Sequence, residues 1–116
     1  MIAVYTFGTV VLLPFPFTNQ AQLKRRPAVV VSNSRYNMAR PDIVVMAISS
    51  QIQASPPIGD VIIAGWREAG LIKPSAIKPL FATIEKTIVI KCLGVLVPND
   101  QGLLDSAIRD CLGRDH

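Results

Sequence analysis

Histidine, cysteine and aromatic residues are scarce in this sequence. Its 116 residues include one histidine and two cysteines, and aromatic residues make up 6% of the chain. The single histidine, His116, is the last residue, so we expect any chemistry to proceed without an imidazole group. Cys92 and Cys111 stand far apart, with no other cysteine and no histidine nearby. This spacing predicts no metal site and no cofactor, and it favours two buried thiols.

Long hydrophobic runs and signal-like segments are also lacking. No stretch of the sequence approaches the ~20 apolar residues of a membrane span. Residues 1–7 lack the basic region and the small-residue cleavage pattern of a signal peptide. We therefore expect a cytoplasmic protein with no membrane partner. A length of 116 residues predicts a single domain over residues 1–116.

Apolar residues and positive charge are what the chain has in excess. Hydrophobic residues make up 50% of the chain, charged residues make up 17%, and the formal net charge is +4. So apolar a composition in a small chain indicates a surface that is buried in a partner, most simply a second copy in a homodimer. The positive excess favours nucleic acid or an acidic protein as a further partner.

Short β-branched runs, separated by prolines and turn residues, predict a mainly β fold. We expect strands over residues 8–13, 27–32, 42–48, 60–64, 83–84, 88–90 and 93–97. Pro14 is expected to end the first strand, and residues 33–37 are expected to form a turn.

The hydrophobic period changes at the end of the chain. Six apolar residues fall on one face of a helix, namely Leu103, Leu104, Ala107, Ile108, Cys111 and Leu112. Asn99 or Asp100 is the expected N-cap, and Gly113 is the expected end of the helix. Several short strands followed by one helix predict a small β-barrel or roll.

A basic cluster stands before the second predicted strand. Lys24, Arg25 and Arg26 precede Pro27, and an apolar run follows. Proline is tolerated at the first residue of a strand, and it forces the residue before it into an extended conformation. Arg26 is then expected to point its guanidinium away from the chain, where it can bind a phosphate or a carboxylate through two hydrogen bonds. The alternative is a solvated loop of charges.

Small polar residues end the third predicted strand. Ser49, Ser50 and Gln51 follow its apolar run, and an antiparallel pairing with the second strand brings Ser49 to the same sheet edge as Arg26. A guanidinium beside a hydroxyl suits a phosphodiester, because the cation neutralises charge that builds on the phosphorus oxygens. RNA supplies its own nucleophile, the 2′-hydroxyl. The alternative is a loop cation and a strand-end serine that bonds only to the backbone.

Other residues are weaker candidates for chemistry. They are Glu68 and Glu85 as bases, Trp66 and Tyr36 as stacking platforms, and Lys73 and Lys78 as phosphate ligands. Neither glutamate has a close partner in the sequence, single aromatic residues are more often part of a core, and exposed lysines usually bind nothing specific.

Five short motifs, in this order and spacing, resemble the MazF/PemK family of toxin–antitoxin endoribonucleases. They are Gly8-Thr9-Val10-Val11, Pro14-Phe15-Pro16-Phe17-Thr18, Arg26-Pro27-Ala28-Val29-Val30-Val31-Ser32, Ala47-Ile48-Ser49-Ser50-Gln51 and Gly70-Leu71-Ile72-Lys73-Pro74-Ser75. The resemblance implies an SH3-like barrel with a C-terminal helix, in a homodimer. It also implies metal-independent cleavage of single-stranded RNA, usually mRNA, to 2′,3′-cyclic phosphate and 5′-hydroxyl ends. The implied partner is a cognate antitoxin whose acidic tail blocks the RNA groove.

The resemblance also implies roles for single residues. Arg26 matches the family arginine before the strand-opening proline, and Ser49 stands where the family usually has a threonine. Arg26 is then expected to stabilise the phosphorane and to protonate the leaving oxygen, while Ser49 orients the phosphate. The implied RNA contacts are Thr18, Lys24, Arg25, Gln51 and Lys78. Lys78 matches an arginine of one branch, but Leu80 replaces that branch's aspartate, so no general base is assigned.

Two other functions stay open at this point. The same barrel occurs in a toxin family that poisons gyrase through its terminal helix and dimer surface, without the ribonuclease residues. The second alternative is a non-catalytic SH3-like module that binds RNA or protein, or a decayed toxin with no activity. The pair of Arg26 and Ser49 argues against the gyrase poison, whereas the serine in place of threonine and the missing acid keep the binding module open.

Overall fold

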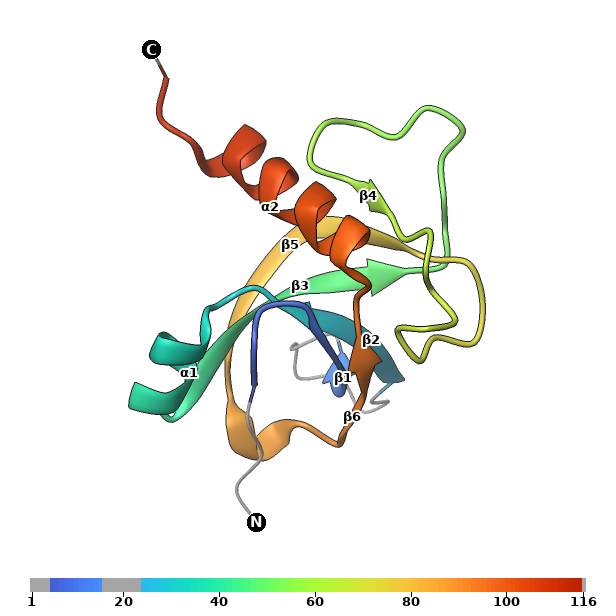
Figure 1. The fold of residues 1–116 in the computed structure, drawn as a ribbon. Helices are drawn as coiled ribbons and strands as arrows, with labels where there is room; N and C mark the ends of the chain where they lie inside the picture. The colour runs from blue at the N-terminus through green and yellow to red at the C-terminus, as the bar shows by residue number, and fades with distance from the viewer. Residues whose placement is uncertain (1–4, 16–23, 116) are drawn as a thin grey trace.

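The protein is a curled antiparallel sheet with one long helix. The computed structural model describes residues 5–15 and 24–115 (Figure 1). The strands are β1 (Thr9–Phe15), β2 (Lys24–Val30), β3 (Asp42–Ser49), β4 (Val61–Ile62), β5 (Ala76–Glu85) and β6 (Lys91–Val95). They form one sheet in the order β4-β5-β3-β2-β1-β6. The helices are α1 (Ser34–Ala39) and α2 (Pro98–Leu112). The predicted mainly β fold with a C-terminal helix is confirmed, and none of the described helices is long and apolar enough to span a bilayer.

Residues 28–30 of β2 and residues 45–48 of β3 are buried, and their side chains reach both faces of the sheet. Val29 and Met46 lie in one core cluster together with Leu104 of α2, whereas Val30 and Val45 lie in a second cluster. Neighbouring residues of a strand point to opposite faces, so each strand contributes side chains to both core clusters. Full burial of one such side chain stabilises the fold by about 1.5–3 kcal/mol. These two strands are therefore the centre of the molecule.

Two prolines lie inside strands, contrary to expectation. Pro14 pairs with Arg25 of β2, but β6 pairs with β1 no further than Leu12. Pro27 lies within β2, whose pairing with β3 reaches only to Ala28. Each proline thus occupies a position where one neighbouring strand is missing. Its absent N–H therefore leaves no ladder hydrogen bond unmade.

Strand β5 is one continuous ten-residue strand with a bulge, although only residues 83–84 were expected to form a strand. Met46 of β3 pairs with Phe81, and Ile48 pairs with Ile77. Two steps along β3 therefore correspond to four steps along β5, so residues 78–80 bulge out of the ladder. Pro79 lies in this bulge, where no ladder partner is required. The prolines that argued against a strand are accommodated in this way.

Two local expectations, one of a turn and one of a strand, are wrong. Residues 33–37 do not form a simple turn, because the Asn33 side chain accepts a hydrogen bond from the Tyr36 N–H and caps α1. Residues 88–90 are not a strand, because the chain makes a 3₁₀ turn over Lys86–Ile88 before β6 begins.

Helix α2 starts earlier than expected, and Asp100 is not its cap. Pro98 occupies the first turn and Val97 is the N-cap residue. The Asp100 side chain is fully buried instead, and its carboxylate oxygens accept hydrogen bonds from the backbone N–H groups of Ala64 (3.3 Å) and Gly65 (2.8 Å). A carboxylate near a helix N-terminus is also favoured by the helix dipole. Asp100 therefore fastens the chain after β4 to α2.

The apolar face predicted for α2 is only partly buried. Leu104 and Ala107 are buried, whereas Leu103, Cys111 and Leu112 are exposed. Cys92, on the edge strand β6, is exposed as well, so the expectation of two buried thiols is wrong. Gly113 ends the helix as expected.

A tight turn over residues 65–71 packs against β6. Gly70 has a φ of +84°, and a Cβ at this position would lie 2.1 Å from the carbonyl oxygen of Leu93. A Cβ on Gly94 would lie 2.6 Å from the carbonyl oxygen of Ala69. Only residues without a side chain allow the two backbones to approach so closely. This contact fixes where the segment over residues 71–75 begins.

We predict that Gly70→Ala lowers the free energy of unfolding by at least about 2 kcal/mol, because the left-handed backbone and the contact with Leu93 both become strained. Urea unfolding measures the change. Gly102→Ala is the matched control, since nothing lies within 4 Å of its Cβ position in α2. The control should gain up to about 1 kcal/mol from helix propensity. Equal stability of the two variants would contradict the close contact at Gly70.

Candidate functional site

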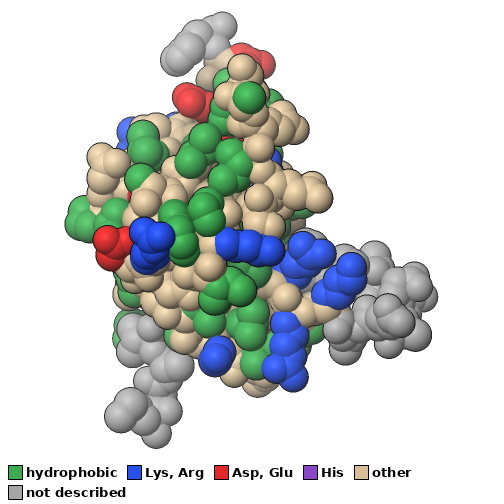
Figure 2. Space-filling view, turned by 90° about the vertical axis from the view of Figure 1, so that its right-hand side faces the viewer, with side chains coloured by type: hydrophobic (Ala, Val, Ile, Leu, Met, Phe, Trp, Pro, Cys, Tyr) green, Lys and Arg blue, Asp and Glu red, His purple; other side chains and the backbone are tan. Residues whose placement is uncertain are grey.

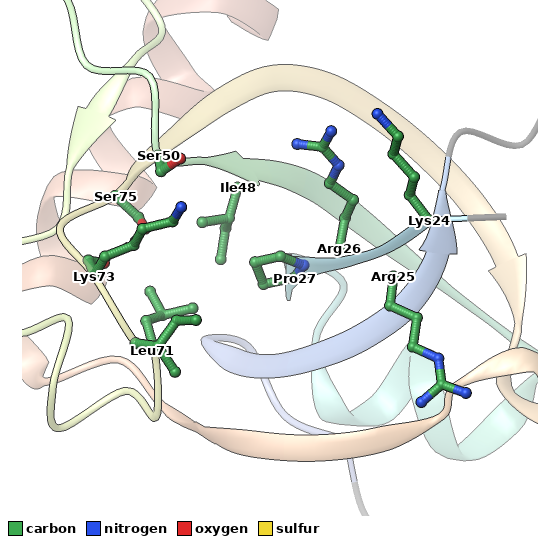
Figure 3. Close-up of a pocket in the computed structure, with 10 residues that line it drawn as sticks. Lys24, Arg25, Arg26, Pro27, Ile48, Ser50, Leu71, Lys73 and Ser75 are labelled. Atoms are coloured by element: carbon green, nitrogen blue, oxygen red, sulfur yellow. The ribbon is translucent and has the colours of Figure 1, made fainter. Parts of the chain in front are cut away.

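An open pocket of about 450 Å³ lies where β2 begins (Figure 3). It brings together the start of β2, the end of β3 and the segment over residues 71–75. Apolar lining comes from Pro27, Ile48, Leu71 and Ile72. Polar and charged lining comes from Lys24, Arg25, Arg26, Ser50, Lys73 and Ser75. We call this the basic pocket.

Four cations surround the basic pocket, and no carboxylate is among its described lining residues. Lys24 and Arg26 project to one side of β2 and Arg25 to the other, as alternation along a strand requires (Figure 3). All three are exposed, and none forms an ion pair within the part of the chain that the structure describes. Figure 2 shows several Lys and Arg side chains gathered on one side of the face that it draws, around hydrophobic side chains. Such an arrangement attracts a polyanion.

The two serines of the basic pocket differ in what they can offer. Ser75 is buried, and its hydroxyl donates to the Lys73 carbonyl at 2.9 Å, so it shapes the loop that carries Lys73. Ser50 is exposed at the end of β3 (Figure 3). Ser50 is therefore the hydroxyl better placed to meet a ligand.

A second pocket, of about 530 Å³, lies beside the end of β3. We call it the serine pocket, and its lining residues are Ser49, Gln51, Ile52, Gln53, Pro57, Asp60, Lys78 and Leu80. The Ser49 Oγ accepts a hydrogen bond from the Gln51 N–H at 3.1 Å. A serine hydroxyl can accept and donate at once, so its hydrogen remains available for a ligand oxygen.

The serine pocket also contains an ion pair. The Lys78 Nζ lies 2.6 Å from the Asp60 Oδ2, and the side chains are 18% and 4% exposed. Asp60 is the one carboxylate among the described residues that line either pocket.

Arg26 and Ser49 lie on neighbouring antiparallel strands, as the sequence predicts. Continuing the register two residues beyond Ala28 and Ala47 aligns Arg26 with Ser49. The two residues nevertheless line different pockets, and the hydroxyls that share a pocket with Arg26 are those of Ser50 and Ser75. The pairing of β2 with β3 ends at Ala28 and Ala47, so no backbone pair holds Arg26 opposite Ser49.

The remaining predicted residues divide between the same two pockets. Lys24 and Arg25 line the basic pocket with Arg26, and Gln51 and Lys78 line the serine pocket with Ser49. Thr18 lies outside the described residues.

The weaker candidates, apart from the two lysines, line neither pocket. Trp66 packs against the core with the Arg67 guanidinium 4.4 Å from its ring centre. The Tyr36 hydroxyl donates to Asp42, and hydrogen bonds from Arg40, and then from Tyr36, hold the pKa of Asp42 below its usual range. Glu68 and Glu85 are exposed and belong to neither pocket. In the two described ranges, no group of three His, Cys, Asp or Glu residues is placed to hold a metal ion.

The sequence analysis gave Lys73 only as a weaker candidate and did not single out Asp60, yet each lines one of the two pockets. The spacing of Lys73 within a Gly-Leu-Ile-Lys-Pro-Ser motif was its only signal. Asp60 carries no local signal, because it meets Lys78 only through the pairing of β4 with β5.

Comparison with known proteins gives one family and a set of similar folds. The family model described as "PemK-like, MazF-like toxin of type II toxin-antitoxin system" matches residues 6–112. No curated protein matches the chain in sequence.

Several solved structures share the fold at low sequence identity. A mycobacterial endoribonuclease in complex with its cognate antitoxin is 16% identical, with a TM-score of 0.77, and 96% of this chain and 97% of that chain are covered. A chain of the MazE-MazF structure from Deinococcus radiodurans is 19% identical, with a TM-score of 0.76, and 97% of this chain and 100% of that chain are covered. The Mycobacterium tuberculosis toxin MazF-mt6 is 16% identical, with a TM-score of 0.74 and 93% and 99% covered.

Proposed function

The chain belongs to the PemK/MazF family of type II toxin–antitoxin toxins, and on that premise we propose that it is an endoribonuclease that cleaves single-stranded RNA, such as mRNA, at short sequences. The observation that carries the proposal is the basic pocket, where Arg26 and three further cations lie beside a strand-end hydroxyl without a carboxylate among the described lining residues. The names of similar structures, which include endoribonucleases, support it.

The proposed reaction uses the nucleophile that RNA carries. The 2′-oxygen forms a bond to the adjacent phosphorus, the bond from phosphorus to the 5′-oxygen breaks, and one proton passes overall from the 2′-hydroxyl to the 5′-oxygen. The products are a 2′,3′-cyclic phosphate and a 5′-hydroxyl. No metal takes part in this proposal, because charge on the phosphorane oxygens is neutralised by guanidinium and ammonium groups.

Arg26 and Ser49 are the proposed catalytic residues. The Arg26 guanidinium is exposed at the pocket, so it can bind two phosphate oxygens through its fork of N–H donors and can protonate the leaving oxygen. The Ser49 Oγ accepts a hydrogen bond from the Gln51 N–H, so its own hydroxyl hydrogen can be donated to a phosphate oxygen. Lys24, Arg25, Gln51, Lys78 and Thr18 are proposed RNA contacts, and the two adjacent pockets suit successive nucleotides of one strand.

The proposed protein partners are an antitoxin and a second copy of the chain. An acidic antitoxin tail matches the same four cations that RNA would use. Exposed apolar side chains that a second copy could cover include Ile52, Leu80, Phe81, Ile88, Ile90 and Val95. Such residues are frequent in homodimer interfaces.

We predict that Arg26→Ala lowers the single-turnover rate of RNA cleavage in EDTA by at least about 100-fold. Removing one preorganised donor costs roughly 2–3 kcal/mol of transition-state stabilisation. The assay incubates a long single-stranded RNA with the protein and maps the cut ends. Arg35→Ala is the matched control, because Arg35 is exposed on α1, which follows the opposite end of β2.

Cleavage by Arg26→Ala at the parental rate would refute the assignment of Arg26. A parental protein that leaves RNA intact would refute the proposed activity itself, and inhibition of a topoisomerase by that protein would instead favour the gyrase poison.

We also predict that Lys73→Met weakens RNA binding roughly two- to fivefold at about 0.15 M salt, because one exposed phosphate contact is lost. The slope of log Kd against log salt should fall by about 0.7, the value for one charge on a single strand. Binding is measured with an oligonucleotide whose cleaved position lacks the 2′-hydroxyl. Arg109→Gln removes the same charge from an exposed position on α2 and should leave the slope unchanged. An unchanged slope in Lys73→Met would remove this residue from the RNA site.

A further inference from the structure

Lys78 and Asp60 form the most buried ion pair in the described part of the chain. Their side chains are 18% and 4% exposed, compared with 53% and 17% for Arg40 and Asp42. Withdrawing two charges from water offsets most of their attraction, so a buried pair adds little to stability compared with apolar side chains of similar size. A role other than stability is therefore the better explanation for this pair.

The backbone holds both members of the pair. The Asp60 N–H donates to the Pro57 carbonyl at 3.1 Å, and the next residue, Val61, pairs with Ile77 of β5. This register places Asp60 directly across from Lys78.

Lys78 is the first residue of the β5 bulge, and the bulge itself is held in place. Gly59 has a φ of +97°, and a Cβ there would lie 3.3 Å from the Cγ of Pro79. The turn before β4 therefore packs on the bulge, and neither end of the ion pair depends on side-chain contacts alone.

The pair lies in the serine pocket, next to further polar side chains. Ser49, Gln51 and Gln53 line the same pocket. An ammonium group has three N–H donors, and Asp60 takes one of them. The other two can serve oxygen atoms of a ligand in the pocket.

We propose that Asp60 is a positioning residue, which holds the Lys78 ammonium beside Ser49 so that this cation meets a phosphate oxygen of the RNA at the cleaved bond. The inference rests on the proposed function. A free lysine side chain samples many rotamers, so an ion pair that selects one of them keeps the charge where the transition state needs it. Asp60 does this without touching the RNA.

The proposal predicts opposite effects on rate and on binding. Removing the Asp60 charge makes the pocket more positive, so simple electrostatics predicts tighter RNA binding in Asp60→Asn. Loss of positioning predicts slower cleavage in the same variant, by roughly tenfold to 100-fold at saturating RNA. A merely structural role for Asp60 would instead lower binding, rate and melting temperature together.

The test compares Asp60→Asn with the parental protein in three measurements. These are the single-turnover cleavage rate at saturating RNA, the Kd for the oligonucleotide without a 2′-hydroxyl at the cleaved position, and the melting temperature. We expect a slower rate with an unchanged or tighter Kd. Asp105→Asn, which removes a carboxylate from the exposed pair with Arg109 on α2, should change neither quantity.

A double-mutant cycle tests whether Asp60 acts through Lys78. In a Lys78→Met background, Asp60→Asn should cause no further loss of rate, because the cation to be positioned is absent. The double variant also replaces the ion pair by two neutral groups of similar size, so no unpaired buried charge remains. Should Asp60→Asn alone fail to fold, Asp60→Glu keeps the charge but shifts it by one methylene, and the same loss of rate at constant Kd is expected.

Two results would overturn the inference, and a third is distinguishable from them. A parental rate in Asp60→Asn, or an equal loss of rate in the presence and absence of Lys78, refutes positioning by Asp60 while the proposed function stands. A parental protein that cleaves no RNA refutes the proposed function, and the inference falls with it.

Discussion

The antiparallel pairing of β2 with β3 is the constraint on which the rest of the molecule depends. Both strands contribute side chains to two hydrophobic cores, and a slip of one residue would exchange the faces of every one of them. The register that both cores enforce also brings the start of β2 to the end of β3. Buried residues 28–30 and 45–48 thereby determine which polar residues meet at the sheet edge.

A second segment completes the site because it is fastened at two points. The buried Asp100 carboxylate holds the backbone of Ala64 and Gly65, and the close contact of Gly70 with β6 fixes the chain five residues later. Lys73 and Ser75 follow directly and line the basic pocket. The position of Lys73 thus depends on the packing of α2, although no residue of α2 lines that pocket.

Local patterns were sufficient for one half of the candidate site and insufficient for the other. Continuous apolar runs identified β2 and β3, and the polar residues at their ends followed from antiparallel pairing, so Arg26 and Ser49 could be predicted as neighbours. Whether they share a pocket depends on side-chain direction beyond the last ladder pair, which the sequence does not encode locally.

The Asp60–Lys78 pair joins residues eighteen positions apart through the pairing of β4 with β5, and Pro79 made β5 look improbable as a strand. The expectation of two buried thiols was wrong because the apolar face of α2 is wider than the core that covers it, which leaves Cys111 exposed, and because Cys92 lies on the edge strand β6.

The unpaired cations at the start of β2 carry a different consequence, which concerns linkage. Like charges held close together repel one another, and no acidic side chain among the described residues relieves Lys24, Arg25 and Arg26. Any polyanion that binds there removes that repulsion, so occupancy and folding stability rise together. One set of cations can neutralise only one polyanion at a time, and a nucleic acid and an acidic peptide directed to this edge of the sheet must therefore exclude each other by charge alone.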